Sequence, residues 1–232
     1  MLLLILAESA LETIPPKLWK HPVIVKYVQK KGRHPNSIVL DRSYHHRAIL
    51  SLKNPEKRGR PDIVHFTLLE ALGSPLNKEG LLQIYVHTIS DKVISVDPTT
   101  RLPRNYTRFV GLIEQLFEYG HVPPNGDPLL KIEDKTLQEL IEELRPSRVI
   151  GFEVSGKPST LKDVIATLKN EDKPAIIIGG FPHGSFREET RSLFNESFCI
   201  DKEVLDASII ASRAIYEYEV MISLTEKRVS QI

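Results

Sequence analysis

The stretch "IIIGGFPHGSF", residues 176–186, runs from an apolar segment directly into a glycine-rich turn. Consecutive isoleucines bounded by turn residues indicate a buried strand. Gly179, Gly180 and Gly184 follow, and glycines after a strand allow a backbone to come close to a ligand. Their spacing is GGxxxG, so the GxGxxG pattern of dinucleotide-binding proteins is not met. The stretch predicts a buried strand followed either by a ligand-binding loop or by a plain strand-to-helix turn.

Strand-like and helix-like segments alternate on both sides of this stretch. Strand-like segments lie at residues 2–7, 37–41, 82–88, 92–97, 147–154, 174–180 and 197–200. Helical spacing of apolar residues occurs at 61–72, 105–120, 137–144, 160–169 and 204–222. Residues 54–61, "NPEKRGRP", and 121–131, "HVPPNGDPLLK", are expected to be loops. Such alternation over most of the chain predicts an α/β fold.

The composition is that of an ordinary globular protein, with 41% apolar and 26% charged residues among 232. One cysteine, Cys199, excludes an internal disulfide framework and fits a reducing compartment. The apolar N-terminal run has no basic leader and is too short to span a bilayer, so we expect a cytoplasmic protein without a membrane segment. No histidine or cysteine pair has metal-site spacing, and we expect no metal.

Charge is distributed unevenly along the chain. Residues 17–60 hold twelve lysines and arginines but only two acidic residues, whereas residues 127–206 hold eleven basic and sixteen acidic residues. This asymmetry favours a polyanion bound on one face. A solvated lysine surface is the alternative.

The stretch "RLPRNYTRF", residues 101–109, carries three arginines and no acidic residue. If a helix starts near Pro103, Arg104 and Arg108 share one face, and the helix N-terminus adds unpaired amide donors. Guanidinium groups bind phosphates through a planar fork of donors, so Arg101, Arg104 and Arg108 favour an RNA backbone. The alternative is surface arginines that pair with acidic residues elsewhere.

The stretch "RGRPDIVH", residues 58–65, places Arg60 and Asp62 on either side of a proline. Aspartate is common at helix N-caps, and a capping role for Asp62 is the favoured interpretation of the spacing alone. The same carboxylate could instead orient or deprotonate a substrate group.

Four blocks together carry a family resemblance. They are residues 60–88, "RPDIVHFTLLEALGSPLNKEGLLQIYVHT"; 101–116, "RLPRNYTRFVGLIEQL"; 178–184, "IGGFPHG"; and 204–216, "VLDASIIASRAIY". In this order they closely resemble the ribosome-biogenesis pseudouridine-N1-specific methyltransferases, the nucleolar-essential-protein family of the SPOUT superfamily. The resemblance covers nearly the whole chain, and the lack of an extra N-terminal tail is similar to archaeal members.

The resemblance implies a fold, a cofactor and partners. It implies a single SPOUT domain over residues 1–232 with family-specific insertions, a C-terminal trefoil knot, and a homodimer. It also implies that S-adenosylmethionine binds in three loops, mainly through backbone contacts. Matched to this sequence, the cofactor residues are Val154, Gly179, Gly184, Ile200, Asp201, Lys202, Glu203, Val204 and Leu205.

The implied substrate is small-subunit, 16S-type ribosomal RNA. The RNA contacts of the family fall on Arg60, Asp62, Arg101, Arg104 and Arg108, with basic regions around residues 17–60 and 101–108. The implied reaction is methylation of N1 of a pseudouridine, in which Asp62 accepts a hydrogen bond from the base or takes the N1 proton. Arg60 is expected to stabilise negative charge on a ring carbonyl.

Two other functions fit the same residues. One is an RNA-binding assembly factor of the small subunit with secondary catalysis or none, working with other assembly proteins. The other is a SPOUT methyltransferase that acts on transfer RNA. The cofactor loops argue against the first, and the two arginine-containing blocks favour the ribosomal branch over the second.

Overall fold

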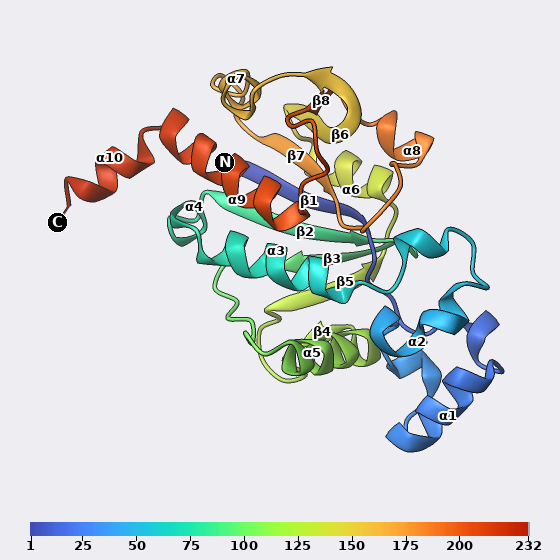
Figure 1. Cartoon of the computed structure of the whole chain (residues 1–232). Coiled ribbons are helices and arrows are strands. Elements are labelled where there is room, and N and C mark those ends of the chain that lie inside the picture. The colour runs from blue at the N-terminus through green and yellow to red at the C-terminus, as the bar shows by residue number, and fades with distance from the viewer. Residues whose placement is uncertain (232) are drawn as a thin grey trace.

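A computed structural model describes residues 1–231 of the chain, and within them eight strands form one mixed sheet (Figure 1). The order across the sheet is β4-β5-β3-β2-β1-β7-β6-β8. The strands are β1 Leu2–Ser9, β2 Leu82–Thr88, β3 Lys92–Val96, β4 His121–Val122, β5 Leu130–Asp134, β6 Arg148–Pro158, β7 Pro174–Gly179 and β8 Glu196–Cys199. The predicted α/β class is confirmed.

The sheet has a parallel part and an antiparallel part. Strands β2, β1, β7, β6 and β8 run parallel, whereas β3, β5 and β4 continue the sheet antiparallel beyond β2. The carboxyl ends of the parallel strands therefore meet at one edge. In open α/β sheets this edge is where ligands bind.

Helices cover both faces of the sheet, and β1 shows why. Its even-numbered leucines, Leu2, Leu4 and Leu6, pack into the same core cluster as the inner sides of α3, α5 and α9, whereas Leu3 and Ile5 pack with α6 on the other face. This is the two-residue period of a strand buried on both sides. The helices are α1 Pro22–Lys31, α2 Arg42–Ile49, α3 Pro61–Gly73, α4 Pro75–Lys78, α5 Tyr106–Tyr119, α6 Leu137–Leu144, α7 Leu161–Ala166, α8 Glu188–Arg191, α9 Ala207–Met221 and α10 Leu224–Val229.

Some of the predicted elements are wrong. Residues 37–41 do not form a strand, because Pro35–Ser37 make a 3₁₀ turn and Val39 forms only an isolated bridge to Thr13. The expected loop at 121–131 contains β4 and the start of β5. Helices α1 and α2 were not expected, since their polar sequences obscure the apolar period. The helix expected at 160–169 ends at Ala166.

Helices α1 and α2 pack around a small core of their own (Figure 1, lower right). Its apolar members include Leu18, Ile24 and Ile49. His45 of α2 is fully buried beside them and meets the ring of Tyr27 edge-on at 4.5 Å. Its Nδ1 accepts the N–H of Asp41 at 3.0 Å, while its Nε2 has no partner within the described residues.

We expect His45 to make the free energy of unfolding depend on pH. Burial lowers the pKa of His45 from 6.5 to about 4, because the neutral ring is favoured away from water. The unfolded chain therefore binds a proton at a pH where the folded protein does not, so stability is lost as the pH falls from 6.5 towards 4. The loss attributable to His45 is about 2–3 kcal/mol.

Denaturant unfolding of the wild type and of His45→Phe between pH 7 and pH 4 measures this effect. The free energy of unfolding should fall more in the wild type than in His45→Phe as the pH is lowered, because the variant has no ring to protonate at this position. His87 is also buried with a lowered pKa, but it contributes equally to both proteins. Parallel curves would show that His45 does not titrate as described.

Candidate functional site

A cavity of about 850 Å³ lies at the carboxyl ends of β7 and β8, beside the middle of β6. Four segments enclose it: the middle of β6, the loop after β7, the loop after β8 with the start of α9, and the first turns of α3. Its lining residues are Arg60, Asp62, Ile63, Phe66, Phe152–Ser155, Ile178, Gly179, Phe181–Phe186, Phe198–Asp201, Glu203–Ser208 and Ile210. The cavity thus sits at the sheet edge that the topology favours for a ligand.

Most of the residues expected to hold a cofactor line this cavity. Val154, Gly179, Gly184, Ile200, Asp201, Glu203, Val204 and Leu205 are all on its wall. Lys202 is exposed in the same loop and is not among the lining residues. The pairing of β6 with β8 is interrupted between Phe152 and Lys157, and Glu153, Val154 and Ser155 of the interrupted stretch line the cavity.

The sequence patterns did not identify the aromatic residues of the cavity wall, and they identified only some of its acidic residues. Phe152, Phe181, Phe186 and Phe198 contribute four aromatic rings. The acidic residues on the wall are Asp62, Glu153, Asp201, Glu203 and Asp206, against the single arginine Arg60. Isolated phenylalanines in strands and turns carry no pattern that distinguishes a cavity wall from a core. Such a lining favours a partly apolar ligand that carries positive charge.

Two glycines of the turn after β7 pack closely against other parts of the chain. A Cβ on Gly180 would lie 2.1 Å from Ser9 Oγ and 2.8 Å from its Cα. Gly184 has a φ of +100°, and a Cβ there would lie 3.1 Å from Lys57 Cε. Gly180 is therefore required for packing against the end of β1, and it is not among the residues that line the cavity.

Arg60 and Asp62 form a pair at the mouth of the cavity. The Arg60 Nε donates to Asp62 Oδ1 at 2.8 Å and Nη2 donates to Oδ2 at 2.7 Å. Asp62 is not the N-cap that its spacing favoured: Arg60 occupies that position, and Asp62 lies in the first turn of α3. There its charge still complements the helix dipole. The hydrogen bonds that Arg60 donates to Asp62 raise the pKa of Arg60, so the guanidinium stays charged.

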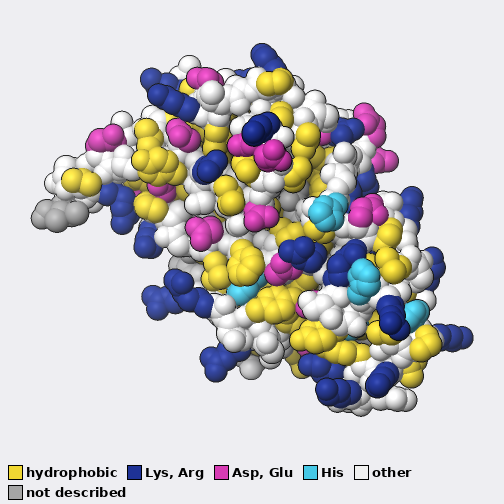
Figure 2. All heavy atoms as spheres, viewed as in Figure 1, with side chains coloured by type: hydrophobic (Ala, Val, Ile, Leu, Met, Phe, Trp, Pro, Cys, Tyr) yellow, Lys and Arg dark blue, Asp and Glu magenta, His cyan; other side chains and the backbone are white. Residues whose placement is uncertain are grey.

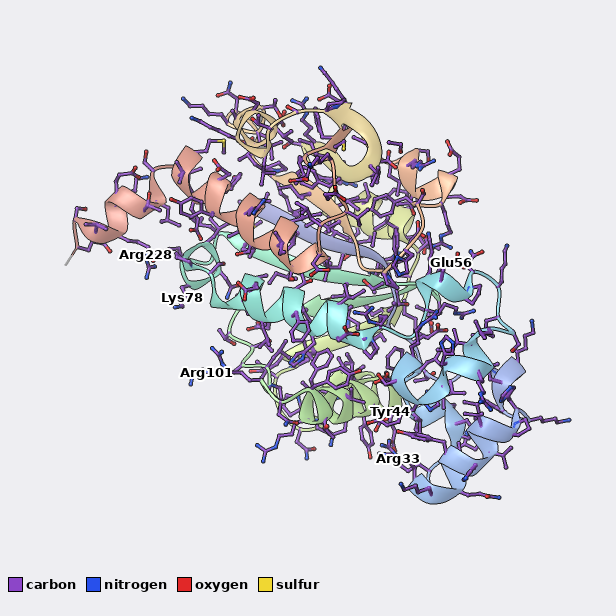
Figure 3. All side chains as sticks on the ribbon, in the orientation of Figure 1. Arg33, Tyr44, Glu56, Lys78, Arg101 and Arg228 are labelled. Atoms are coloured by element: carbon purple, nitrogen blue, oxygen red, sulfur yellow. The ribbon has the colours of Figure 1, made fainter. Side chains whose placement is uncertain are left out.

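The loop before α5 and the first turn of α5 present three exposed arginines outside the cavity wall. Helix α5 begins at Tyr106 with Asn105 as its N-cap, so Arg104 precedes the helix and does not share a helical face with Arg108 as expected. Within residues 1–231, Arg101, Arg104 and Arg108 form no ion pair. Figure 3 shows Arg101 pointing outward from this loop. The three charges are free for a phosphate backbone.

His65 anchors this loop to α3. It is fully buried, its ring stacks on Phe109 with centroids 4.2 Å apart, and its Nε2 lies 2.7 Å from the carbonyl oxygen of Pro103. Asp62 lies on the same helix, three residues earlier. The arginine loop is therefore held at a fixed place relative to the pair at the cavity mouth.

The basic stretch of residues 17–60 divides into two groups. Arg33, Arg42, Lys57, Arg58 and Arg60 are engaged with acidic side chains or backbone carbonyls. The exposed group is Lys17, Lys20, Lys26, Lys30, Lys31, Arg47 and Lys53. Figure 2 shows lysine and arginine side chains, in dark blue, around the α1–α2 part of the molecule. The exposed group forms a positive surface, which is smaller than the twelve basic residues of the sequence suggest.

Other kinds of site find no support in the described part of the chain. Residues 1–231 contain no cluster of three potential metal ligands. Among the same residues, no helix is both long enough and apolar enough to cross a bilayer. Cys199 is half-buried on the cavity wall and contacts the carbonyl oxygen of Asp201 at 3.2 Å.

A carboxylate-rich cavity at the ends of parallel strands, with free arginines beside it, defines an α/β enzyme that handles a small ligand next to a polyanion. Comparison with known proteins identifies the kind of enzyme. The chain belongs to the EMG1/NEP1 methyltransferase family, whose sequence pattern matches residues 4–219. The resemblance inferred from the four sequence blocks is confirmed, and the chain is a methyltransferase.

Several relatives are similar over nearly their whole length. The chain is 46% identical to "Ribosomal RNA small subunit methyltransferase Nep1" of Staphylothermus marinus, covering 91% of this chain and 92% of the relative. It is 46% identical to the protein of that name from Pyrococcus furiosus, over 93% and 95% of the two chains. Among solved structures, "Archaeoglobus Fulgidus Nep1 bound to S-adenosylhomocysteine" superposes with a TM-score of 0.83 at 36% identity, covering 95% and 98% of the two chains.

Proposed function

We propose that the chain transfers a methyl group from S-adenosylmethionine to N1 of a pseudouridine in small-subunit ribosomal RNA. The observation that carries the proposal is that Arg60 and Asp62 open into the same cavity as the three expected cofactor loops. A methyl donor in the loops would lie beside a base held by the pair. The names of the relatives and the product bound in the Archaeoglobus protein support this substrate and this cofactor.

The cavity suits S-adenosylmethionine in shape and in charge. Its aromatic side chains, among them Phe152 and Phe198, suit a planar purine, and glycine-rich loops allow backbone groups to contact the ligand. The sulfonium and the amino group of the cofactor are cationic, and the acidic wall favours both. Asp201, Glu203 and Asp206 are exposed in the loop after β8 and at its end, where they can approach these charges.

The chemistry requires removal of a proton and alignment of a lone pair. Pseudouridine keeps a free N1–H, which uridine lacks because its N1 bonds the ribose. As the N1–H proton leaves, the nitrogen lone pair forms a bond to the methyl carbon, the S–CH₃ bond breaks, and S-adenosylhomocysteine departs. Asp62 accepts the N1–H, either to orient the base or to take the proton. Arg60 uses two of its five N–H groups on Asp62 and donates others to a ring carbonyl that gains negative charge.

Binding of the RNA backbone is assigned to Arg101, Arg104 and Arg108, with the exposed lysines of residues 17–53 extending the surface. Replacing the three arginines by alanine should reduce RNA affinity at least tenfold. It should also reduce the slope of log affinity against log salt by about 2, since each phosphate contact on a single strand contributes about 0.7. Fluorescence anisotropy at four salt concentrations measures both quantities.

The control for this prediction carries the same change in net charge. Lys162, Lys169 and Lys227 are exposed and lie outside the cavity and the arginine loop. Their triple alanine variant should keep the wild-type slope. Equal slopes for the wild type and the arginine variant would remove the assignment of these arginines to phosphates.

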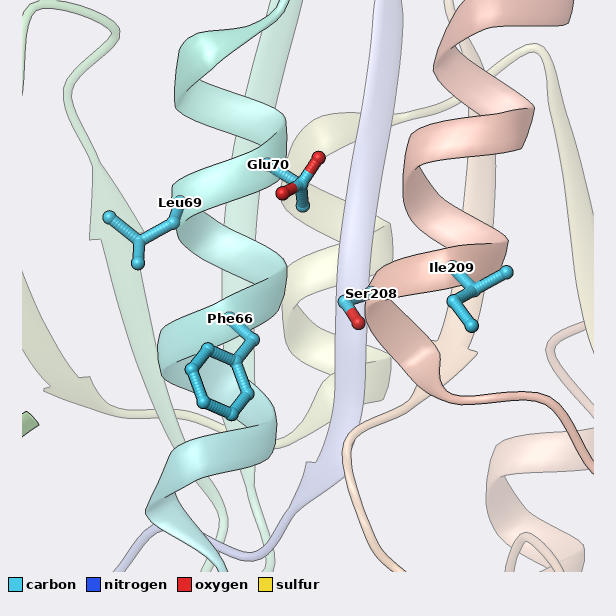
Figure 4. A pocket seen from close by; sticks show the side chains of 5 residues that line it. All are labelled: Phe66, Leu69, Glu70, Ser208 and Ile209. Carbon is cyan, nitrogen blue, oxygen red and sulfur yellow. The ribbon is translucent and has the colours of Figure 1, made fainter. Parts of the chain in front are cut away.

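A homodimer is supported by an apolar strip along α3 and α9. Phe66 and Ile209 are 54% and 39% exposed, and they line a hollow together with Leu69, Glu70 and Ser208; Figure 4 shows these side chains on α3 and on the start of α9. Tyr216 and Val220 continue the exposed apolar surface along α9. A patch of this kind on a methyltransferase next to its cavity fits a second copy of the chain. Light scattering of the wild type and of Ile209→Asp gives the oligomeric state directly.

The whole chain, residues 1–232, is proposed to act as one SPOUT domain, with the loops of the cavity threaded in a trefoil knot. The α1–α2 unit would be the family-specific insertion that carries part of the basic surface. The RNA substrate and the single unpaired cysteine fit work in the cytoplasm.

The deciding experiment compares two RNA stem-loops that differ only in one pseudouridine or uridine. Each is incubated with labelled S-adenosylmethionine, and methyl transfer and RNA binding are measured in parallel. Transfer to the pseudouridine RNA alone is expected. Tight binding without transfer would favour an assembly factor, and transfer confined to transfer RNA loops would favour the transfer RNA alternative.

A further inference from the structure

Glu8, at the end of β1, is held in an unusual way. Its side chain is 1% exposed, and its φ of +50° lies in the left-handed region that a non-glycine residue rarely adopts. The pairing of β1 with β2 is interrupted between Leu6 and Ser9, and the Glu8 N–H donates instead to His87 Nδ1 at 3.2 Å. Such a conformation persists only when surrounding contacts require it. The hydrogen bonds of the Glu8 carboxylate are the contacts that require this conformation.

The carboxylate of Glu8 joins the loop that follows β7 to Lys57. Oε1 accepts the backbone N–H of Arg187 at 2.7 Å, and Oε2 accepts a hydrogen bond from Lys57 Nζ at 2.7 Å. Lys57 is itself 5% exposed, although it comes from the basic stretch. Buried charges of this kind are retained when they are paired and fully hydrogen-bonded.

Lys57 makes three more contacts, all with the same loop. Its Nζ donates to the carbonyl oxygen of Ser185 and lies 4.2 Å from the centroid of the Phe181 ring. Its stem runs beside Gly184, where a Cβ would come within 3.1 Å of Lys57 Cε. Phe181, Gly184 and Ser185 all line the cavity on their other side. The pair thus lies directly behind the loop that faces the ligand.

We propose that Glu8 and Lys57 are positioning residues that set the shape of the cofactor loop, residues 179–187, and thereby the affinity for the cofactor. The inference rests on the proposed function, because it takes the cavity ligand to be S-adenosylmethionine. Neither residue is among those that line the cavity. The pair acts by fixing one backbone carbonyl, one backbone N–H and one aromatic ring of the loop.

The same segment also carries the Arg60–Asp62 pair. Lys57 joins Glu8, Arg58 joins Glu12 with Nε–Oε1 at 2.7 Å, and the Arg60 N–H donates to the carbonyl oxygen of Ala10 at 3.1 Å. Residues 57–60 are thus attached to residues 8–12 along their length. The cofactor loop and the base-facing pair share one rigid support, so that methyl donor and acceptor are aligned by the same buried contacts.

Calorimetric titration with S-adenosylhomocysteine tests the proposal on the full chain. Lys57→Met should raise the dissociation constant at least tenfold, while RNA affinity measured by anisotropy changes less than threefold. Arg58→Met is the matched control, because it also leaves a nearly buried glutamate unpaired beside β1 but touches no residue of the cofactor loop. It should lower thermal stability while changing the dissociation constant less than threefold.

A double variant separates positioning from stability. Glu8→Gln with Lys57→Met leaves no unpaired charge buried, so it should recover much of the melting temperature lost in Lys57→Met. The weakened binding of S-adenosylhomocysteine should remain, because Ser185 and Phe181 still lack their partner. Wild-type binding by the double variant would overturn the inference. If the wild type itself fails to bind S-adenosylhomocysteine, the proposed cofactor is wrong instead.

Discussion

Asp62→Asn is expected to lower kcat for methyl transfer to pseudouridine by about 10²–10³-fold, the range typical of losing a general base or an equivalent hydrogen-bond acceptor. Asparagine keeps the shape of the side chain but removes the negative charge that accepts the N1–H. It also turns an amide –NH₂ towards Arg60, and because a guanidinium has no acceptor, one of the two hydrogen bonds in the pair is lost. The loss should appear in single-turnover rates at saturating RNA and cofactor.

The fold should tolerate this change. Arg60 is 41% exposed and Asp62 is 27% exposed, so their ion pair contributes about 1 kcal/mol or less to stability. RNA affinity should fall by less than the rate, since the phosphate contacts are assigned to other arginines. Glu142→Gln, an exposed carboxylate on α6 outside the cavity and the proposed dimer surface, is the control and should retain wild-type turnover. Intact RNA binding with unchanged turnover in Asp62→Asn would remove Asp62 from the chemistry.

The sequence predicted most of the parallel part of the sheet because those strands are buried on both faces and read as continuous apolar runs. The antiparallel extension was harder. β5 alternates charged and apolar residues and follows a proline-rich segment, so its neighbourhood looked like a loop. Its pairing with β3 depends on residues nearly forty positions earlier in the chain, which a local pattern does not contain. A knot is a property of the chain path, and no periodicity predicts it.

The chemistry of the site was predictable in kind but not in detail. Arg60 and Asp62 were both expected at the site, yet Arg60 holds the cap position, because α3 begins at Pro61 and Asp62 therefore lies inside its first turn. Lys57 and Arg58 counted as surface charge in the sequence. Their partners, Glu8 and Glu12, lie more than forty residues earlier, and only the fold brings them together.

Gly180→Ala is expected to cost about 3 kcal/mol or more of folding free energy, at the upper end of what overpacking causes. The new Cβ would lie 2.1 Å from Ser9 Oγ and 2.8 Å from the Ser9 Cα, so rotation of the serine hydroxyl cannot relieve it. The backbone cannot move away either: the Gly180 N–H donates to Ala7 O at 2.9 Å, and its carbonyl accepts the N–H of Ala10 at 2.8 Å. Gly180, the second residue of the cofactor loop, is therefore held on both sides, by Ala7 of β1 and by Ala10 just after it.

Gly111→Ala is the control, because the same added methyl meets open space within α5, with no heavy atom inside 4 Å. Alanine favours the helix by up to about 1 kcal/mol there, so the two variants should move the denaturation midpoint in opposite directions. A midpoint for Gly180→Ala equal to that of the wild type would mean that β1 and the cofactor loop can separate at little cost. The buried contacts of Glu8 and Lys57 would then be unable to hold the loop, since they act across the same boundary.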